Sequence, residues 1–120
     1  MVTLVICLKR RADLTFNEFD SHWRNIHAPL IRRSRPFSSY VKRYIQYQIE
    51  EDEQEVGDVF GVRGAFDGIE LLEFEDSAAM EVALSSPDYL LEIQTDTAKF
   101  VDVSACRRIV LQNDALILFG

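Results

Sequence analysis

The sequence of 120 residues has few cysteines and no long apolar run, so it lacks features that mark metal-binding, secreted and membrane proteins. Its two cysteines, Cys7 and Cys106, match no metal or redox spacing, and we interpret both as buried free thiols. The longest apolar runs fall far short of the roughly 20 residues that cross a bilayer, so we expect no membrane association. The first residues lack the basic stretch and cleavage pattern of a signal peptide, which makes the cytoplasm the expected location.

Positive charge and cofactor motifs are also scarce. The chain has 13 Lys and Arg against 20 Asp and Glu, a formal net charge of −7, whereas nucleic acid requires a basic surface. We therefore expect no nucleic-acid partner. Neither a glycine-rich phosphate loop nor a His, Cys and carboxylate cluster at metal spacing occurs, so the sequence predicts no metal and no cofactor. The acidic run at residues 50–55 predicts a solvated loop over 50–64.

Hydrophobic residues make up 48% of the chain, which is typical of a globular protein, and the length predicts a single domain over residues 1–120. Hydrophobic periodicity predicts the elements. The expected strands cover 2–8, 40–49, 69–74 and 103–111, with a short fifth at 116–119, and the expected helices cover 14–33, 77–84 and 88–99.

The first predicted helix has a clear beginning and one apolar face. Thr15 and Glu18 have the spacing of a capping box, in which each side chain accepts a hydrogen bond from the backbone of the other. At 100° per residue, one face gathers the apolar side chains Phe16, Phe19, Trp23, Ile26, Leu30 and Ile31. This face predicts a helix that packs against the sheet.

The order of elements, β-α-β-β-α-β, predicts an α+β, ferredoxin-like fold with a four-stranded antiparallel sheet and both helices on one face. The strand at 40–49 carries apolar or aromatic side chains on both faces, for example Tyr44 and Ile45. The face without helices then needs a cover. We expect a symmetric homodimer that packs sheet against sheet; a tetramer or another partner would also cover this face.

His27 is the residue most open to a chemical role. It lies within about 20° of the direction of Phe16 on the first helix, so it faces the core or a cavity inside it. Two interpretations remain open: a neutral core histidine that makes one hydrogen bond, or a general acid/base in an apolar pocket. His22 points away from this stripe and is predicted to lie on the surface.

A family resemblance favours the chemical interpretation. The helix closely resembles the signature of the EthD family in the run Phe16-x-x-Phe19-x-x-x-Trp23-x-x-x-His27-Ala28-Pro29-Leu30. Other segments resemble the same family, namely Lys9-Arg10, Tyr40-Val41, 66–69 and 100–102. The resemblance implies a dimeric α+β barrel, a fold that hosts cofactor-free monooxygenases, polyketide cyclases, lactone isomerases and haem proteins.

The resemblance also implies particular site residues. The family histidine corresponds to His27. The family's third-strand glutamate has no counterpart at the matching position, which holds Leu71 between Glu70 and Glu73. Because side chains alternate along a strand, Leu71 points to the opposite face from Glu70.

We therefore predict an enzyme that acts on a small aromatic, polyketide-like or lactone molecule by cofactor-independent acid/base chemistry, of isomerase, cyclase, dehydratase or oxygenase type, with His27 as catalytic residue. Candidate substrate-binding residues are Trp23, Tyr40, Tyr44 and Asp67; sheet packing for the tyrosines and a turn for Asp67 are the structural alternatives. Two other functions stay open: a non-catalytic ligand-binding or accessory dimer, and a structural dimer with a filled core.

Overall fold

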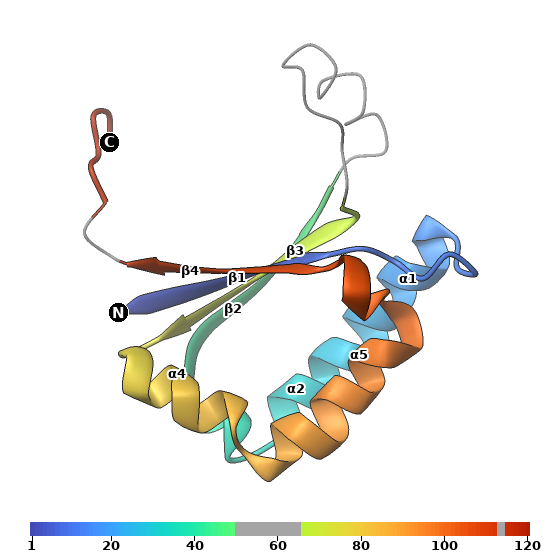
Figure 1. The fold of residues 1–120 in the computed structure, drawn as a ribbon, viewed down its shortest axis with the longest axis horizontal. Coiled ribbons are helices and arrows are strands. Elements are labelled where there is room, and N and C mark those ends of the chain that lie inside the picture. Colours follow the sequence, from blue (N-terminus) through green and yellow to red (C-terminus); the bar gives the residue numbers. More distant parts are fainter. Residues whose placement is uncertain (50–65, 113–114) are drawn as a thin grey trace.

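The computed structural model describes residues 1–49, 66–112 and 115–120. Four antiparallel strands form one sheet in the order β2-β3-β1-β4, and the helices lie together on one side of it (Figure 1). This is the predicted α+β, ferredoxin-like fold. The loop predicted over 50–64 lies outside the described residues.

The strands follow the predicted pattern except near the C-terminus. Their bounds are Val2–Leu8 for β1, Val41–Gln48 for β2, Gly68–Phe74 for β3 and Arg107–Gln112 for β4. The prediction that the fourth strand begins at residue 103 is wrong, because Val103–Ala105 form a 3-10 turn, η4. The amides of Ala105 and Cys106 donate to Asp102 and Val103 within this turn, so they are not available to pair with β1.

The short fifth strand predicted at 116–119 is also wrong. Residues 115–120 form no strand, and the four apolar side chains Leu116, Ile117, Leu118 and Phe119 are exposed. An apolar run favours a strand only where a neighbouring strand accepts its backbone hydrogen bonds. The run at 116–119 pairs with no strand in the described part of the chain.

The first helix is continuous but contains a wider turn. It consists of α1 (Phe16–His22), a π-helical turn η1 (Trp23–His27) and α2 (Ala28–Arg33). In the π turn the Ala28 amide donates to the Trp23 carbonyl, five residues back, so the helix rotates past its regular period. Ile26, predicted on the apolar face, is therefore 51% exposed, while Trp23 and His27 are buried.

The helix termini match the sequence signals. The predicted capping box is confirmed: the Glu18 amide donates to Thr15 Oγ1 at 3.1 Å, and the Thr15 amide donates to Glu18 Oε1 at 2.9 Å. Asp76 also caps a helix, since its side chain accepts from the Ala79 amide at 2.8 Å. It begins α4 (Ser77–Leu84), which has its predicted bounds.

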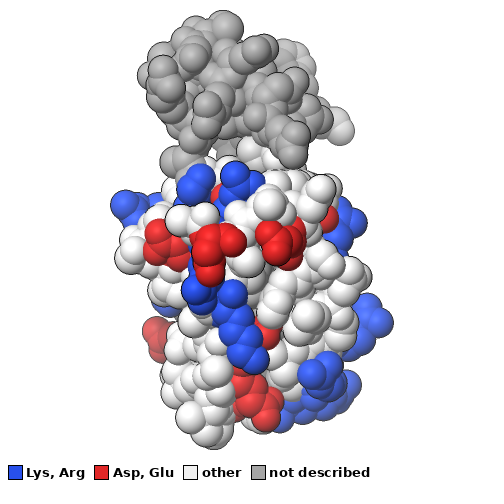
Figure 2. All heavy atoms as spheres, turned by 90° about the vertical axis from the view of Figure 1, so that its right-hand side faces the viewer, with Lys and Arg blue, Asp and Glu red and all other residues white. Residues whose placement is uncertain are grey.

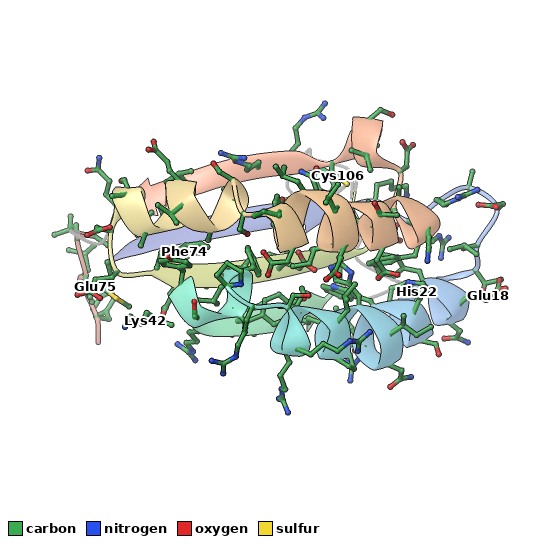
Figure 3. All side chains as sticks on the ribbon, turned by 90° about the horizontal axis from the view of Figure 1, so that it is seen from below. Glu18, His22, Lys42, Phe74, Glu75 and Cys106 are labelled. Carbon is green, nitrogen blue, oxygen red and sulfur yellow. The ribbon has the colours of Figure 1, made fainter. Side chains whose placement is uncertain are left out.

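A second π turn lies in the last helix. Tyr89–Ile93 form η3 and Gln94–Phe100 form α5, close to the predicted range of 88–99. A short 3-10 turn, η2 (Phe37–Tyr40), leads into β2. Seen from the helix side, α1–α2 and α4–α5 form two rows across the sheet (Figure 3). Across residues 1–49, 66–112 and 115–120, no helix has the length and apolar character needed to cross a membrane.

Alternation along the strands separates two faces of the sheet. Leu4, Leu72 and Phe74 lie under the helices and are buried in the core. On the opposite face, the strand register aligns a row of apolar residues, Ile45, Leu71, Val5 and Ile109. No helix of the described residues covers this row in the single chain, and Ile109 is exposed. We call this surface the open face.

Charged side chains are mixed on the side of the molecule that Figure 2 presents. Lys and Arg alternate there with Asp and Glu, and no large patch of one sign forms on that side. Nucleic-acid binding depends on a basic patch or stripe that follows the phosphates. This face therefore has no such footprint among the described residues.

Gly68 allows β3 to approach the first helix, and its replacement by Ala should destabilise the fold. A Cβ atom at this position would lie 2.6 Å from two carbon atoms of the buried Trp23 ring. Because the ring is enclosed, we expect a loss of about 1–3 kcal/mol in the free energy of unfolding, measured by denaturant titration. Gly120→Ala is the control, since its Cβ would meet only the exposed Ile117 side chain at 3.0 Å. Equal stability of the two variants would contradict this account of Gly68.

Candidate functional site

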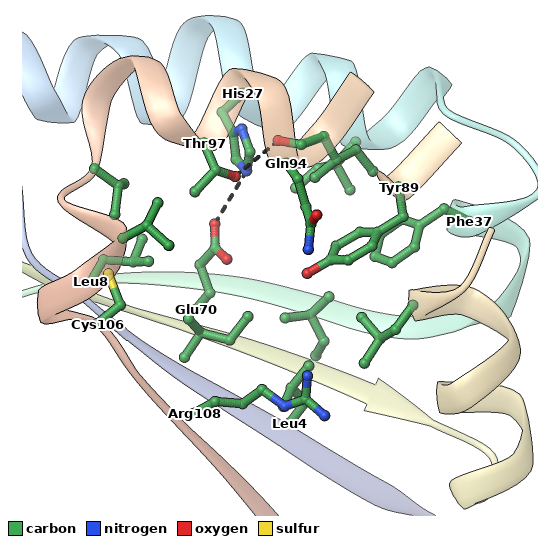
Figure 4. A pocket seen from close by; sticks show the side chains of 17 residues that line it. Leu4, Leu8, His27, Phe37, Glu70, Tyr89, Gln94, Thr97, Cys106 and Arg108 are labelled. Carbon is green, nitrogen blue, oxygen red and sulfur yellow. Dashed lines mark hydrogen bonds and ion pairs between the residues drawn. The ribbon is translucent and has the colours of Figure 1, made fainter. Parts of the chain in front are cut away.

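A cavity of about 400 Å³ lies between the sheet and the helices (Figure 4). This volume is within the range of small-molecule sites. Most of its wall is apolar, and its polar side chains include His27, Glu70, Gln94, Thr97 and Arg108. A mainly apolar pocket with a few polar groups can hold an organic molecule and orient it.

His27 lines this cavity at the end of η1, as the sequence predicts, and is 2% exposed. Its Nδ1 lies 2.8 Å from Oδ2 of Asp96, a buried residue of α5. The hydrogen bond joins the two helical rows. It also fixes the orientation of the imidazole ring relative to the cavity.

Asp96 has a second histidine partner. His22 Nε2 lies 3.0 Å from Asp96 Oδ1, and the His22 ring stacks on Phe100 with centroids 4.6 Å apart. The prediction that His22 lies on the surface is wrong, since only 20% of its side chain is exposed. The reason is tertiary: α5 packs beside α1 and brings Asp96 and Phe100 to the flank of the helix.

The two histidines determine the protonation of Asp96. Burial acts to raise the pKa of Asp96, but the hydrogen bonds from His27 and then His22 outweigh it and hold the pKa below its ordinary value of 3.8. Asp96 is therefore an acceptor near neutral pH, and His27 donates through Nδ1. In neutral His27 the Nε2 atom then carries a lone pair, which is the form that a general base requires.

Nε2 of His27 faces a second carboxyl group. It lies 3.6 Å from Oε1 of Glu70, which is 6% exposed on β3. This separation is longer than a hydrogen bond. In the neutral form of His27 described above, Nε2 and Glu70 Oε1 are both acceptors, so they present two neighbouring acceptors to a proton donor of a ligand.

Glu70 is held in place by two donors. The Trp23 Nε1–H and the Tyr44 hydroxyl each donate to Glu70 Oε1, both at 2.8 Å. Gln46 Nε2 in turn donates to the Tyr44 oxygen at 2.9 Å. Burial, and then the Glu70 carboxyl, raise the pKa of Tyr44 far above its ordinary value, so the hydroxyl keeps its proton. Glu70 is thus a fixed acceptor below His27.

Sequence reasoning missed Glu70 and Asp96 as site residues. The family comparison directed attention to position 71, whose side chain lies on the open face. Strand alternation contained the signal for Glu70, because Glu70 has the same parity as the core residues Leu72 and Phe74. No comparable signal marked Asp96, whose burial depends on the histidines of a helix far away in the sequence.

The other predicted binding residues lie around the cavity rather than on its wall. Trp23 and Tyr44 contact Glu70, as described. Tyr40 belongs to η2 and packs on the core. Asp67 accepts from the Arg10 amide at 2.8 Å, and its carboxylate lies 3.7 Å from Lys9 Nζ. Neither Tyr40 nor Asp67 is among the described residues that line the cavity.

The site offers proton transfer in an apolar enclosure. If His27 takes a proton at Nε2, the resulting imidazolium lies between the carboxyl groups of Asp96 and Glu70, which stabilise its charge. Within the described ranges, no group of three or more His, Cys, Asp and Glu side chains is placed to hold a metal ion. The geometry of His27, Asp96 and Glu70 supports acid/base chemistry.

Comparison of sequences identifies one family. The sequence model of the EthD domain matches residues 11–104, which include the helix that carries His27 and the strand that carries Glu70. No curated protein matches the chain in sequence.

Solved structures share the fold at low sequence identity. An EthD family protein from Bacillus halodurans has a TM-score of 0.67 and 19% identity over 94% of this chain and 99% of its own. A dimeric protein of unknown function with a ferredoxin-like fold, from Bacteroides fragilis, has a TM-score of 0.65 and 12% identity over 93% and 95%. SnoaB, a cofactor-independent oxygenase from Streptomyces nogalater, has a TM-score of 0.62 and 13% identity over 98% and 97%.

Replacing Asp96 with Asn should lower the melting temperature at neutral pH. The pKa of Asp96 in the folded chain lies below 3.8, so its stabilisation is present above that value and is lost as the pH falls through the lowered pKa. The difference in melting temperature between Asp96→Asn and the parent protein should therefore persist from pH 7 to about pH 4 and narrow as the pH falls further to 3, as measured by circular dichroism.

The control for this prediction is Asp102→Asn, because the exposed Asp102 carboxylate accepts a hydrogen bond from nearby Ser104. We expect this variant to melt like the parent protein at each pH. If the melting temperature of Asp96→Asn stays below that of the parent protein by the same amount down to pH 3, packing rather than charge explains the role of Asp96.

Proposed function

Because this chain belongs to the EthD family, we propose that it is an enzyme that acts on a small, largely apolar organic molecule by cofactor-independent proton transfer at His27. The observation that carries the proposal is the placement of this histidine. Its Nδ1 is fixed by Asp96 at 2.8 Å, and its Nε2 is directed toward Glu70 in the cavity.

The proposed reaction begins with a substrate in the apolar cavity and an acidic C–H or O–H group near His27 Nε2. His27 takes this proton, while Asp96 keeps the ring in position through Nδ1. Glu70, held by Trp23 and Tyr44, stabilises the imidazolium. General acid/base catalysis of this kind contributes roughly 10²–10⁴-fold to a rate.

The fate of the proton and of the substrate anion defines the reaction type. Return of the proton to another atom gives isomerisation, and loss of a leaving group or attack on a carbonyl gives dehydration or cyclisation. Reaction of the anion with molecular oxygen is an oxygenase reaction. A cofactor-independent oxygenase occurs among the proteins of similar fold, which supports small-molecule chemistry as a function of this architecture.

The proposal predicts that His27→Gln greatly slows proton abstraction. 2-Tetralone, an aromatic ketone with acidic C–H groups, is a suitable probe, and NMR in deuterated water measures the exchange of these hydrogens. The parent protein should accelerate the exchange, and His27→Gln should reduce the acceleration on the order of 10²-fold. Glu92→Gln, on the exposed side of η3, should retain it.

Two further measurements make this test decisive. Thermal melting shows whether His27→Gln is folded, since a buried unmatched hydrogen bond costs about 1–3 kcal/mol. Saturation-transfer NMR shows whether tetralone binds to the parent protein. Binding without accelerated exchange would refute the enzyme proposal and favour the non-catalytic binding function.

We also propose that a second copy of the chain covers the open face. The row Ile45, Leu71, Val5 and Ile109 presents a continuous apolar surface of a kind that monomers rarely expose. The similar protein from Bacteroides fragilis is described as dimeric. Two sheets packed face to face would remove this surface from water.

Leu71→Glu should therefore convert a dimer into a monomer. Leu71 lies between Ile45 and Val5 in the row, so a charge there would be desolvated in the dimer. Light scattering should give the parent protein about twice the chain mass of 13.8 kDa, and the variant the single mass. Leu91→Glu, on an exposed helical position, is the control and should remain dimeric. A monomeric parent protein at micromolar concentration would contradict the proposal.

A further inference from the structure

We propose that Arg108 binds an anionic group of the substrate, so that the natural ligand is an apolar molecule with a carboxylate or a similar anion at one end. This inference rests on the proposed function in one respect, namely that the cavity is the substrate site. To the proposed function it adds the charge of the ligand and the direction in which the ligand lies in the cavity. Arg108 lines the cavity from the sheet side, on β4 (Figure 4).

The strand register places Arg108 in line with Glu70. Arg108 is opposite Ile6, and Ile6 is opposite Glu70, so the three residues form one row across the face of the sheet that the helices cover. Neighbouring strands are about 4.8 Å apart, which puts the backbones of Arg108 and Glu70 roughly 10 Å apart. Ile6 forms an apolar floor between the cationic and the acidic ends of this row.

The guanidinium of Arg108 is available for a ligand. In the described part of the chain it makes no ion pair or hydrogen bond with another side chain, whereas Lys9 and Arg10 lie 3.7 and 3.9 Å from the Asp67 carboxylate. Arginine remains charged at any physiological pH. Its fork of N–H donors matches two oxygens of a carboxylate, sulfonate or phosphate.

The two ends of the row from Glu70 to Arg108 impose opposite preferences on a charged ligand. The carboxyl groups of Glu70 and Asp96 lie beside His27 and disfavour an anionic substituent there. Arg108 attracts the same substituent to the other end. A ligand with one anionic group is thereby held in one direction, with its uncharged reacting part at His27. Arg108 is on this account a residue that determines specificity, and His27 remains the group that transfers the proton.

A matched pair of fluorescent dyes tests the inference without knowledge of the natural ligand. Anilinonaphthalene sulfonate and N-phenylnaphthylamine share the same rings, but only the first carries an anionic group. The parent protein should bind the sulfonate more tightly, and Arg108→Gln should weaken its binding on the order of tenfold. Binding of the uncharged dye should not change. Arg33→Gln, which removes an exposed arginine at the end of α2, should alter neither affinity.

The position of the dyes separates this inference from the proposed function. Amide NMR signals of Gln94 and Thr97, two residues of the cavity wall, should shift when either dye binds. If neither dye shifts them, the cavity is not the ligand site, and both proposals fail. If both dyes bind there equally and Arg108→Gln affects neither, the role of Arg108 is overturned while the apolar site stands. Circular dichroism of Arg108→Gln confirms that a loss of affinity is not a loss of fold.

Discussion

The hydrogen bond between His27 Nδ1 and Asp96 Oδ2 is the interaction on which the site depends. It joins the two helical rows through residues that are 69 positions apart in the sequence, in a region from which water is largely excluded. A buried carboxylate without partners would be costly, and the two histidines remove that cost. The same bond determines which nitrogen of His27 faces the cavity, so one interaction supports both the packing of the helices and the proposed chemistry.

The two π turns explain how the helices present these groups. η1 ends at His27, and η3 precedes the turn of α5 that carries Asp96. A π turn interrupts the regular helical period and is frequent at functional sites. In η1 it exposes Ile26 and leaves Trp23 and His27 directed inward, so the apolar stripe and the polar site share one helix.

β3 connects the site with the open face. Glu70 points toward His27, and its neighbour Leu71 lies in the centre of the apolar row on the other side. Successive residues of one strand thus lie in the proposed site and on the open face, because side chains alternate across a sheet. The described residues of the proposed site lie on the face of the sheet that the helices cover, whereas the proposed partner would contact the opposite face.

The sequence by itself determined the order of elements, the capping of the first helix, the burial of His27 and the family. These features depend on short-range periodicity and on residues a few positions apart, as with Thr15 and Glu18. The sequence did not reveal the π turns, and it placed His22 on the surface.

Only the tertiary structure decided which charged residues meet. Glu70 is 47 residues from Trp23 in the sequence, and Asp96 is 74 residues from His22. Arg108 joins the row of Glu70 through the register of three strands. No local sequence pattern indicates these pairings. A buried polar residue is recognised by the partner that forms a hydrogen bond with it, and that partner comes near only when the sheet and the helices pack.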